Sequence, residues 1–194
     1  FLAMASHELR TPLNGIIGFA DCLKEDLEDE GQRECARTIY SSGCTLLGMV
    51  NSVLDLAKIE SGRADWNGCE LDLKEVIEQS IAATSQLFRE KGADVELDLP
   101  DNPPLILADR DRLIQVMLNL LSNAVKFLAP GSGRVRVVLQ RLADGLEVSV
   151  ADNGPGIRAE DQQLIFEKFR QVGDTMTAKP AGTGLGLPIS RRIV

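Results

Sequence analysis

The segment Lys24-Glu25-Asp26-Leu27-Glu28-Asp29-Glu30-Gly31 decides the fold of the N-terminal part of the chain. On each side of it, apolar residues recur at helical steps, the spacing of a helix with one buried face. The charged segment itself predicts a solvated turn. We therefore expect an antiparallel hairpin of two helices, whose apolar positions are Leu13, Ile16, Ile17, Ala20, Leu23 and Leu27 before the turn and Ile39, Leu46, Val50, Val53 and Ala57 after it.

Two helices alone cannot enclose both apolar stripes. A second copy of the chain, related by twofold symmetry, completes a four-helix bundle, so the sequence predicts a homodimer through the hairpin. The second helix is expected to end at Gly62, because glycine is a common helix stop and the residue pattern changes beyond it. We expect one domain over residues 1–62 and another over residues 63–194.

The second domain alternates short apolar runs with longer amphipathic segments. This alternation predicts an α/β sandwich of mixed sheet and helices, so the expected fold class of the whole chain is α+β. Strands are expected at 69–73, 93–99, 105–108, 134–142 and 146–151, and helices at 74–91 and 109–127.

The 194 residues include 29 acidic and 21 basic side chains, with a net charge of −8. This balance gives no broad basic surface, so neither nucleic acid nor anionic lipid is an expected partner. No apolar run approaches the ~20 residues that span a bilayer, and no signal peptide begins the chain. Because the chain begins at Phe1 and stops inside an expected helix, we interpret it as a cytoplasmic piece of a larger protein, with any sensor or anchor outside it.

The four cysteines form no Cys-x-x-Cys pair, and the chain has a single histidine, so no zinc site is expected. Reduced thiols are the expected state. For Cys22, Cys35 and Cys44 the sequence favours the role of a small buried apolar side chain, and a redox role stays open.

A polar stripe runs along the expected helix 109–127, where Gln115, Asn119, Asn123 and Lys126 follow one another at helical steps. An exposed helix face explains such a stripe, but exposed faces favour Glu and Lys over Asn, a mediocre helix former. The alternative is a Mg²⁺ site, because amide oxygens suit this hard cation and phosphates complete its ligands. Lys126 would then neutralise phosphate charge.

The expected strand 146–151 leads directly into Asp152, which shares the face of the strand's apolar residues. This alternation predicts a carboxylate aimed toward the core. The following segment 153–157 reads as a tight turn, for which a plain loop is a sufficient explanation. A buried carboxylate needs a donor, however, and an adenine amino group beside a wall opened by Gly154 and Gly156 would supply one.

The segment Gly182-Thr183-Gly184-Leu185-Gly186-Leu187 has the composition of a phosphate-binding loop. Its glycines let backbone amides approach an anion without hindrance from Cβ atoms, and Pro188 suits the first turn of a following helix. A helix N-terminus there favours phosphate. No strand precedes it, so it is neither a Walker nor a Rossmann motif. The polar, small residues at 171–181 predict a mobile lid.

The chain resembles the sensor histidine kinases of two-component signalling, over nearly its whole length. Its single histidine, His7, lies in the first of five segments that match this family in order. The family implies a dimerising helical hairpin followed by an ATP-binding domain of the GHKL (Bergerat) type shared with Hsp90, gyrase and MutL. The segments are Ser6 to Asn14, Asn119 to Phe127, Asp152 to Ile157, Phe166-Glu167-Lys168-Phe169 and Gly182 to Leu187.

The sequence departs from the family at three points. Leu128 stands where a small hydroxyl residue is common, Pro188 stands where alanine is common, and the strands that usually follow the last helix are absent. The ATP-binding domain is therefore expected to be incomplete at its C-terminal end.

The resemblance implies that ATP phosphorylates His7 and that the phosphoryl group then passes to an aspartate of a response-regulator receiver domain. Neutral imidazole is a good nucleophile, Glu8 is the implied base or orienting carboxylate, and Thr11 is implied in regulator dephosphorylation. Pro12 is expected to kink the helix. The implied nucleotide contacts are Asn119, Asn123, Lys126, Phe127, Asp152, Gly154, Gly156, Ile157, Phe169, Gly182, Thr183, Gly184, Leu185 and Gly186, with Asn123 and Asn119 as Mg²⁺ ligands.

Two other functions remain open. A GHKL-type ATPase would hydrolyse ATP to drive a conformational change, but it has no need of the segment around His7. A silent scaffold would use the same fold for protein binding, but it would be expected to lose Asn123, Asp152 or the glycines, and all are present.

Overall fold

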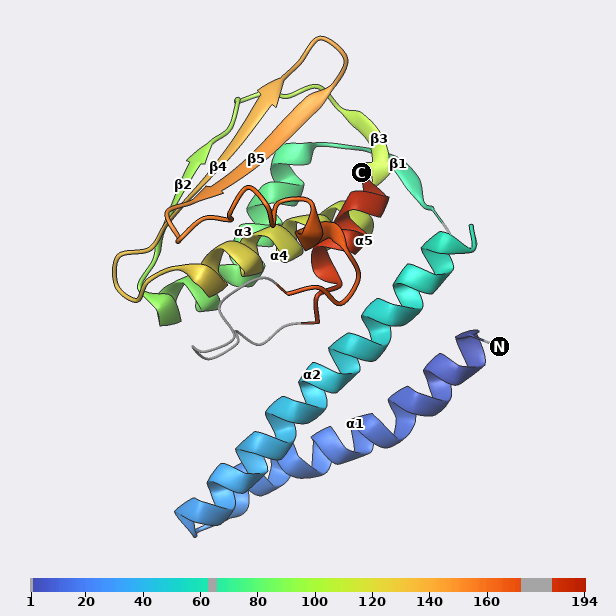
Figure 1. Cartoon of the computed structure of the whole chain (residues 1–194), viewed down its shortest axis with the longest axis vertical. Helices are drawn as coiled ribbons and strands as arrows, with labels where there is room; N and C mark the ends of the chain where they lie inside the picture. The colour runs from blue at the N-terminus through green and yellow to red at the C-terminus, as the bar shows by residue number, and fades with distance from the viewer. Residues whose placement is uncertain (1, 63–65, 172–182) are drawn as a thin grey trace. The chain divides into compact units, whose positions relative to one another are not determined.

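The structure is a computed structural model that describes residues 2–62, 66–171 and 183–194, with side chains from Leu9 onward. Contacts within the chain divide it into two compact units, Phe1–Ala64 and Asp65–Val194. The first is a helical hairpin and the second combines sheet and helices (Figure 1).

The hairpin consists of α1 (Leu2–Asp26) and α2 (Glu30–Glu60), as the periodicity predicts. The turn between them is shorter than expected, because the helices extend into the charged segment from both sides. Asp29 caps α2 by accepting a hydrogen bond of 2.8 Å from the Gln32 N–H. Charged residues at i,i+3 spacing stabilise a solvated helix end as readily as a turn. The charged composition of residues 24–31 therefore predicted a longer turn than the one between Asp26 and Glu30.

Small residues line the contact between the two helices. Ala20 and Ala36 are 2% and 3% exposed, and a Cβ added to Gly43 would lie only 2.7 Å from the Ile17 Cγ1. The helices therefore approach closely at this level. Helix α1 continues through Pro12, and the kink expected there remains a prediction.

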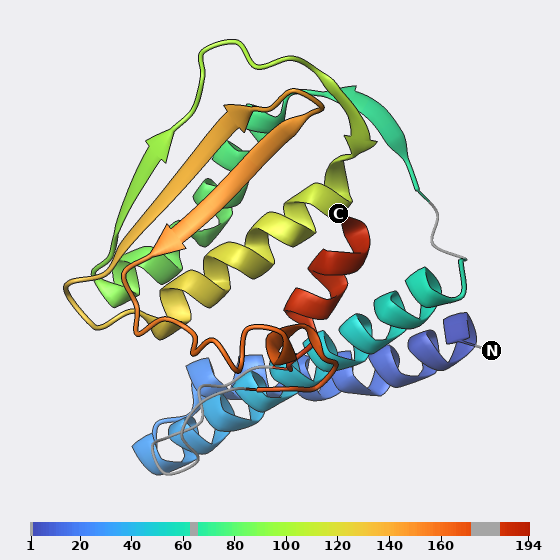
Figure 2. The same ribbon diagram turned by 45° about the horizontal axis from the view of Figure 1, so that its top comes forward.

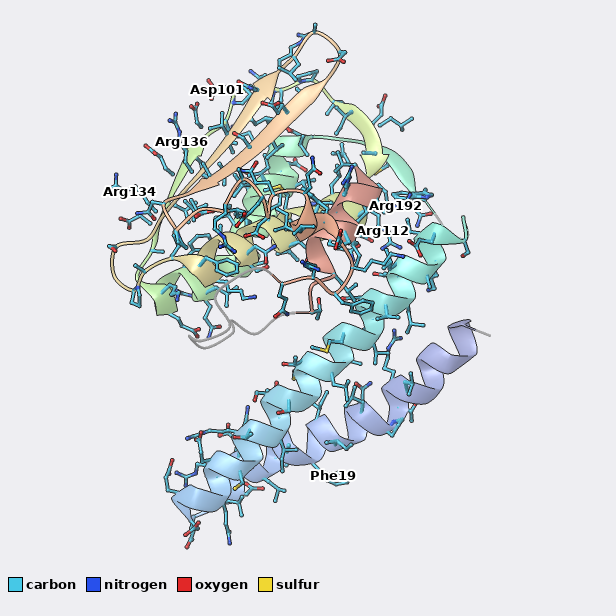
Figure 3. All side chains as sticks on the ribbon, in the orientation of Figure 1. Phe19, Asp101, Arg112, Arg134, Arg136 and Arg192 are labelled. Atoms are coloured by element: carbon cyan, nitrogen blue, oxygen red, sulfur yellow. The ribbon has the colours of Figure 1, made fainter. Side chains whose placement is uncertain are left out.

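A single hairpin leaves much of its apolar surface open, and Phe19 projects outward from α1 (Figure 3). Most of the exposed apolar residues belong to the expected stripes, whereas Leu9 and Phe19 lie outside them. The exposed set is Leu9, Ile16, Phe19, Leu23, Ile39, Leu46 and Val53.

The prediction that the hairpin cysteines are buried is wrong. Cys22, Cys35 and Cys44 are all exposed, as is Cys69 in the second unit. The narrow contact between the helices is filled by other residues, and helical spacing turns the cysteines away from it.

The second unit contains two sheets and three α-helices within the described residues, in agreement with the predicted mixed sandwich. Strand β2 (Asp94–Asp98) pairs in parallel with β4 (Arg134–Arg141), which pairs antiparallel with β5 (Leu146–Asp152). Strand β1 (Gly68–Leu71) pairs antiparallel with β3 (Ile106–Asp109). The helices are α3 (Leu73–Lys91), α4 (Arg110–Phe127) and α5 (Gly186–Ile193), with a short 3₁₀ turn, η1 (Leu164–Phe166).

Helices α3 and α4 cover one face of the three-stranded sheet, and their contact with it forms the core (Figure 2). Val76 and Ile77 of α3, Leu121 of α4, and Val135 and Val137 of β4 are fully buried there. On the opposite face, the side chains of Arg134 and Arg136 project into solvent (Figure 3). The sheet thus has one packed and one solvated face, as an antiparallel pair allows.

The polar residues that begin the helices explain small differences from the expected boundaries. Asp72 accepts a hydrogen bond of 2.8 Å from the Lys74 N–H and caps α3, so strand β1 ends earlier than predicted. Asp109 caps α4 by accepting a bond of 3.1 Å from the Arg112 N–H. None of the helices in the described ranges is long and apolar enough to cross a membrane.

Candidate functional site

The polar stripe on α4 is half-buried rather than fully exposed. Asn119, Asn123 and Lys126 each lose part of their surface to neighbouring segments, which weakens the explanation of the stripe as a plain solvent face. Burial lowers the pKa of the Lys126 ammonium, whose Nζ lies 5.1 Å from the centre of the Phe127 ring. A partly desolvated cation of this kind gains from an anionic ligand.

Asn119 joins α4 to the start of α5. Its Nδ2 donates to the Gly186 carbonyl oxygen and to the Ser190 hydroxyl, both at 3.3 Å. A Cβ added to Gly186 would lie 3.3 Å from the Asn119 Oδ1, so the amide lies flat on this glycine. The sequence reasoning missed Ser190, although its position one helical turn after Gly186 was a usable signal.

Among the described residues, no side chain caps the N-terminus of α5, and N–H groups at such a helix end can bind an anion. Thr183 orders the preceding turn, because its Oγ1 accepts a hydrogen bond of 3.1 Å from the Leu185 N–H. Pro188 lies within the first turn, as predicted, where its missing N–H removes no helical hydrogen bond. Backbone N–H groups at Gly186 and Leu187 therefore form the end of the helix.

The segment around Phe169 lies directly against Gly184. The Phe169 N–H donates to the Gly184 carbonyl oxygen at 3.0 Å, and a Cβ on Gly184 would lie 2.7 Å from the Phe169 carbonyl carbon. Phe169 has a φ of 62°, a left-handed conformation that is uncommon for a bulky residue. Such local strain is typical of segments held for function.

The turn after β5 packs against the end of α4. The Asp152 Oδ1 accepts a hydrogen bond of 2.8 Å from the Gly154 N–H, and a Cβ on Gly154 would lie 3.2 Å from the Phe127 carbonyl oxygen. Asn153, which the sequence reasoning also missed, fastens this turn to β4, since its Oδ1 accepts a bond of 2.7 Å from the Arg134 N–H. Its signal was weak, because many turns contain asparagine.

The prediction that Asp152 is buried is wrong. Its side chain is exposed, because β5 ends at this residue and the turn opens to solvent instead of continuing along the core. The Asp152 carboxylate already accepts a hydrogen bond from the Gly154 N–H of the following turn. Its environment therefore does not require a ligand to supply a donor.

Several of the expected nucleotide-binding residues meet at α4, where Asn119 lies against Gly186 and Phe127 lies against Gly154. Three exposed apolar side chains lie on these segments: Ile157, Phe169 and Phe127 are 48%, 65% and 41% exposed. Gly156 has a φ of 72°, a conformation that favours glycine. Gly182 and most of the expected lid fall within 172–182 and lie outside the described residues.

The remaining predicted site residues belong to the hairpin. His7 and Glu8 lie in α1, and Thr11 is exposed one turn after His7. Among the described residues, no group of three or more His, Cys, Asp or Glu side chains is arranged to hold a metal. The amide oxygens of Asn119 and Asn123 are donors of the kind that suits Mg²⁺.

Two family models match the chain. The model described as "His Kinase A (phospho-acceptor) domain" matches residues 1–62, and the model described as "Histidine kinase-, DNA gyrase B-, and HSP90-like ATPase" matches residues 108–194. The sensor histidine kinase AruS of Pseudomonas aeruginosa is 41% identical over 202 residues, which cover all of this chain and 20% of AruS. The chain spans between 10% and 22% of the length of four curated relatives that it matches, AruS among them.

Solved structures agree with these matches. Full-length ShkA in complex with AMPPNP superposes with a TM-score of 0.80 at 35% identity, covering 99% of this chain and 40% of ShkA. Histidine kinase ThkA in complex with the response regulator protein TrrA superposes with a TM-score of 0.64 at 26% identity, covering 99% of this chain and 53% of that chain.

Proposed function

This chain belongs to the sensor histidine kinases, and we propose that it transfers the γ-phosphoryl group of ATP to His7 and then to an aspartate of a response-regulator receiver domain. The observation that carries the proposal is that the start of α5 contacts Asn119 of α4 and the turn after Asp152 contacts Phe127 of α4, while the Phe169 segment packs on Gly184 just before α5. Both the relative bound to AMPPNP and the relative bound to a response regulator support it.

The nucleotide would bind along this convergence. The N–H groups at the start of α5 suit phosphate oxygens, and the Lys126 ammonium supplies positive charge close by. One oxygen of Asp152 accepts from its own turn, which leaves the other as the acceptor for an adenine amino group. The exposed apolar side chains of Ile157 and Phe169 would pack on the base.

The residues present fit a Mg²⁺ ion. The Asn119 nitrogen donates to α5, and the amide oxygens of Asn119 and of Asn123, one turn later, are the donors that would hold the cation. The ion, when bound, neutralises phosphate charge during transfer.

Phosphorylation forms a bond between an imidazole nitrogen of His7 and the γ-phosphorus and breaks the bond from that phosphorus to the bridging oxygen of ADP. Glu8 would accept or orient the proton that the imidazole releases. Adjacent helical residues do not face each other, so this role of Glu8 needs side-chain reach or the other subunit. Attack by a regulator carboxylate on the phosphorus then breaks the nitrogen–phosphorus bond and restores His7.

We assign residues 1–62 to dimerisation and phosphotransfer and residues 63–194 to ATP binding. The open apolar surface on both hairpin helices supports a homodimer, because a second copy would cover it in a four-helix bundle. We place the reaction in the cytoplasm, because ATP and response regulators are found there.

The decisive experiment is incubation of the chain with γ-labelled ATP and Mg²⁺, followed by acid and alkali treatment. The expected label is labile in acid and stable in alkali, as a phosphohistidine is. His7→Gln is expected to lose the label and keep its ATP affinity, because the acceptor and the nucleotide site lie in different units. Asn123→Ala is the matched variant, in which His7 is intact and Mg²⁺-dependent labelling is lost.

The alternatives give different results in the same assay. Free phosphate without labelled protein would indicate an ATPase. No nucleotide binding at all would indicate a scaffold, and retained acid-labile label in His7→Gln would contradict the assignment of the acceptor.

A further inference from the structure

Ser190 is a buried polar residue on α5 that none of the proposed roles uses. Its side chain is enclosed, with 7% of the residue exposed, and its hydroxyl lies 3.3 Å from the Asn119 Nδ2. Ser190 and Asn119 are far apart in sequence and come from different helices. Burying a hydroxyl between two helices costs desolvation free energy unless the hydroxyl forms a hydrogen bond. The partner in that bond therefore indicates the role of Ser190.

The Asn119 amide bridges two successive turns of α5. Its nitrogen donates to the Gly186 carbonyl oxygen and to the Ser190 Oγ, which lie one helical turn apart on the same face. The carbonyl can only accept, so the end of the amide that faces α5 is the nitrogen. The two hydrogen bonds therefore fix the orientation of the whole amide, including its oxygen, which lies beside Gly186.

The apolar neighbours of Ser190 hold α5 against the domain, but they do not fix its rotation about the helix axis or its position along that axis. Leu185 and Ile189 are each 1% exposed and anchor the helix by packing, which is not directional. The two hydrogen bonds to Asn119 are directional and set the position of Gly186, whose N–H begins the helix.

We propose that Ser190 is a positioning residue: by holding the Asn119 amide, it fixes the phosphate-binding start of α5 relative to the asparagines of α4. The inference rests on the proposed nucleotide site. It adds the specific claim that Ser190 acts on ATP through Asn119 and not by contact with the nucleotide.

The test is calorimetric titration of AMPPNP with Mg²⁺ into the 194-residue chain and its variants. Ser190→Ala is expected to raise the Kd about 5-fold, the size of one neutral hydrogen bond. In an Asn119→Ala background, the same Ser190→Ala substitution is expected to leave the Kd unchanged, because the partner of the hydroxyl is already gone. Ser190→Thr keeps the hydroxyl and is expected to recover most of the affinity.

Ser80→Ala is the matched control for a general loss of stability. Ser80 is 0% exposed and donates 2.7 Å to the Val76 carbonyl oxygen within its own helix. This variant is expected to lower the melting temperature and leave the Kd for AMPPNP unchanged. If the role of Ser190 were merely structural, Ser190→Ala would likewise lower the melting temperature and leave the Kd for AMPPNP unchanged.

Two results overturn the inference while leaving the proposed function intact: an unchanged Kd in Ser190→Ala, or an equal effect of that substitution with and without Asn119. Failure of the wild-type chain to bind AMPPNP overturns the proposed function and this inference together.

Discussion

Replacing Gly184 by alanine is expected to disrupt the joint between the Phe169 segment and the start of α5. Gly184 has a φ of 67°, a left-handed conformation that costs an L-residue about 1–2 kcal/mol. The added Cβ would also lie 2.7 Å from the Phe169 carbonyl carbon and 2.9 Å from the Arg170 carbonyl oxygen. These atoms belong to the backbone, so relief of the clash requires the segment to move and to break the Phe169 to Gly184 hydrogen bond, worth about 1 kcal/mol.

The expected total is a destabilisation of about 2–3 kcal/mol in the second unit. Thermal unfolding followed by circular dichroism measures it, and for a unit of this size the melting temperature should fall by roughly 6–12 °C. Nucleotide affinity should fall as well, because the phosphate-binding end of α5 loses its neighbour.

Gly131→Ala separates the two contributions. Gly131 has a φ of 74° and open space around its Cα, so this variant carries the conformational cost without a clash. It should destabilise the unit by about 1–2 kcal/mol. Equal shifts in the two variants would refute the claim that Phe169 is clamped by Gly184.

Three further predictions concern other parts of the chain. Asp109→Ala should destabilise the second unit by about 1 kcal/mol at neutral pH, since it removes the cap of α4. The Asn67 N–H, at 2.9 Å, holds the pKa of Asp109 below its ordinary 3.8. The stability that the Asp109 carboxylate contributes is therefore complete above pH 3.8 and fades as the pH falls through the lower folded-state pKa. Urea unfolding of the wild type and Asp109→Ala at several pH values measures this contribution. A stability difference that persists in strong acid would contradict the prediction. Asp152 should favour ATP over GTP, because its carboxylate accepts from the adenine amino group and repels the guanine carbonyl oxygen. Once a bound base covers the carboxylate, this mispairing costs roughly 1 to 3 kcal/mol, or about 10- to 100-fold in affinity; competitive binding measures the ratio, and equal affinities would contradict the placement of the base at Asp152. Thr11→Ala should keep autophosphorylation and phosphotransfer but slow the decay of regulator phosphate in the presence of ADP, since placing a water needs a hydroxyl; equal decay rates would remove this role.

Periodicity was enough to predict both hairpin helices and α4, because each has a long apolar face with helical spacing. Burial of individual residues was harder to predict. The alternation of β5 correctly indicated its inner face but said nothing about the chain beyond Asp152, where the turn leaves the core. The cysteines of the hairpin were placed inside by residue type, whereas their angular position on the helix puts them outside.

Contacts between distant segments were beyond the sequence reasoning. The polar stripe on α4 was visible, but nothing in it named Ser190 as the partner of Asn119. Likewise, the glycine segment was recognised from composition, and its contact with Phe169 emerged only from the fold. Such pairings depend on tertiary packing, which local patterns do not encode.

The three described glycines at 154, 184 and 186 have a consequence for engineering. An added methyl group would meet Asp152 and Phe127 at Gly154, the Phe169 and Arg170 backbone at Gly184, and the Asn119 side chain at Gly186. A Cβ at Gly154 or Gly184 would come within 3.0 Å of a neighbouring atom, so these two positions of the site require glycine, whereas at Gly186 the Asn119 side chain would have to shift. Attempts to change nucleotide preference should instead begin with Ile157 and Phe127, because their side chains are exposed and residues of other sizes can extend into solvent there without a clash with the backbone.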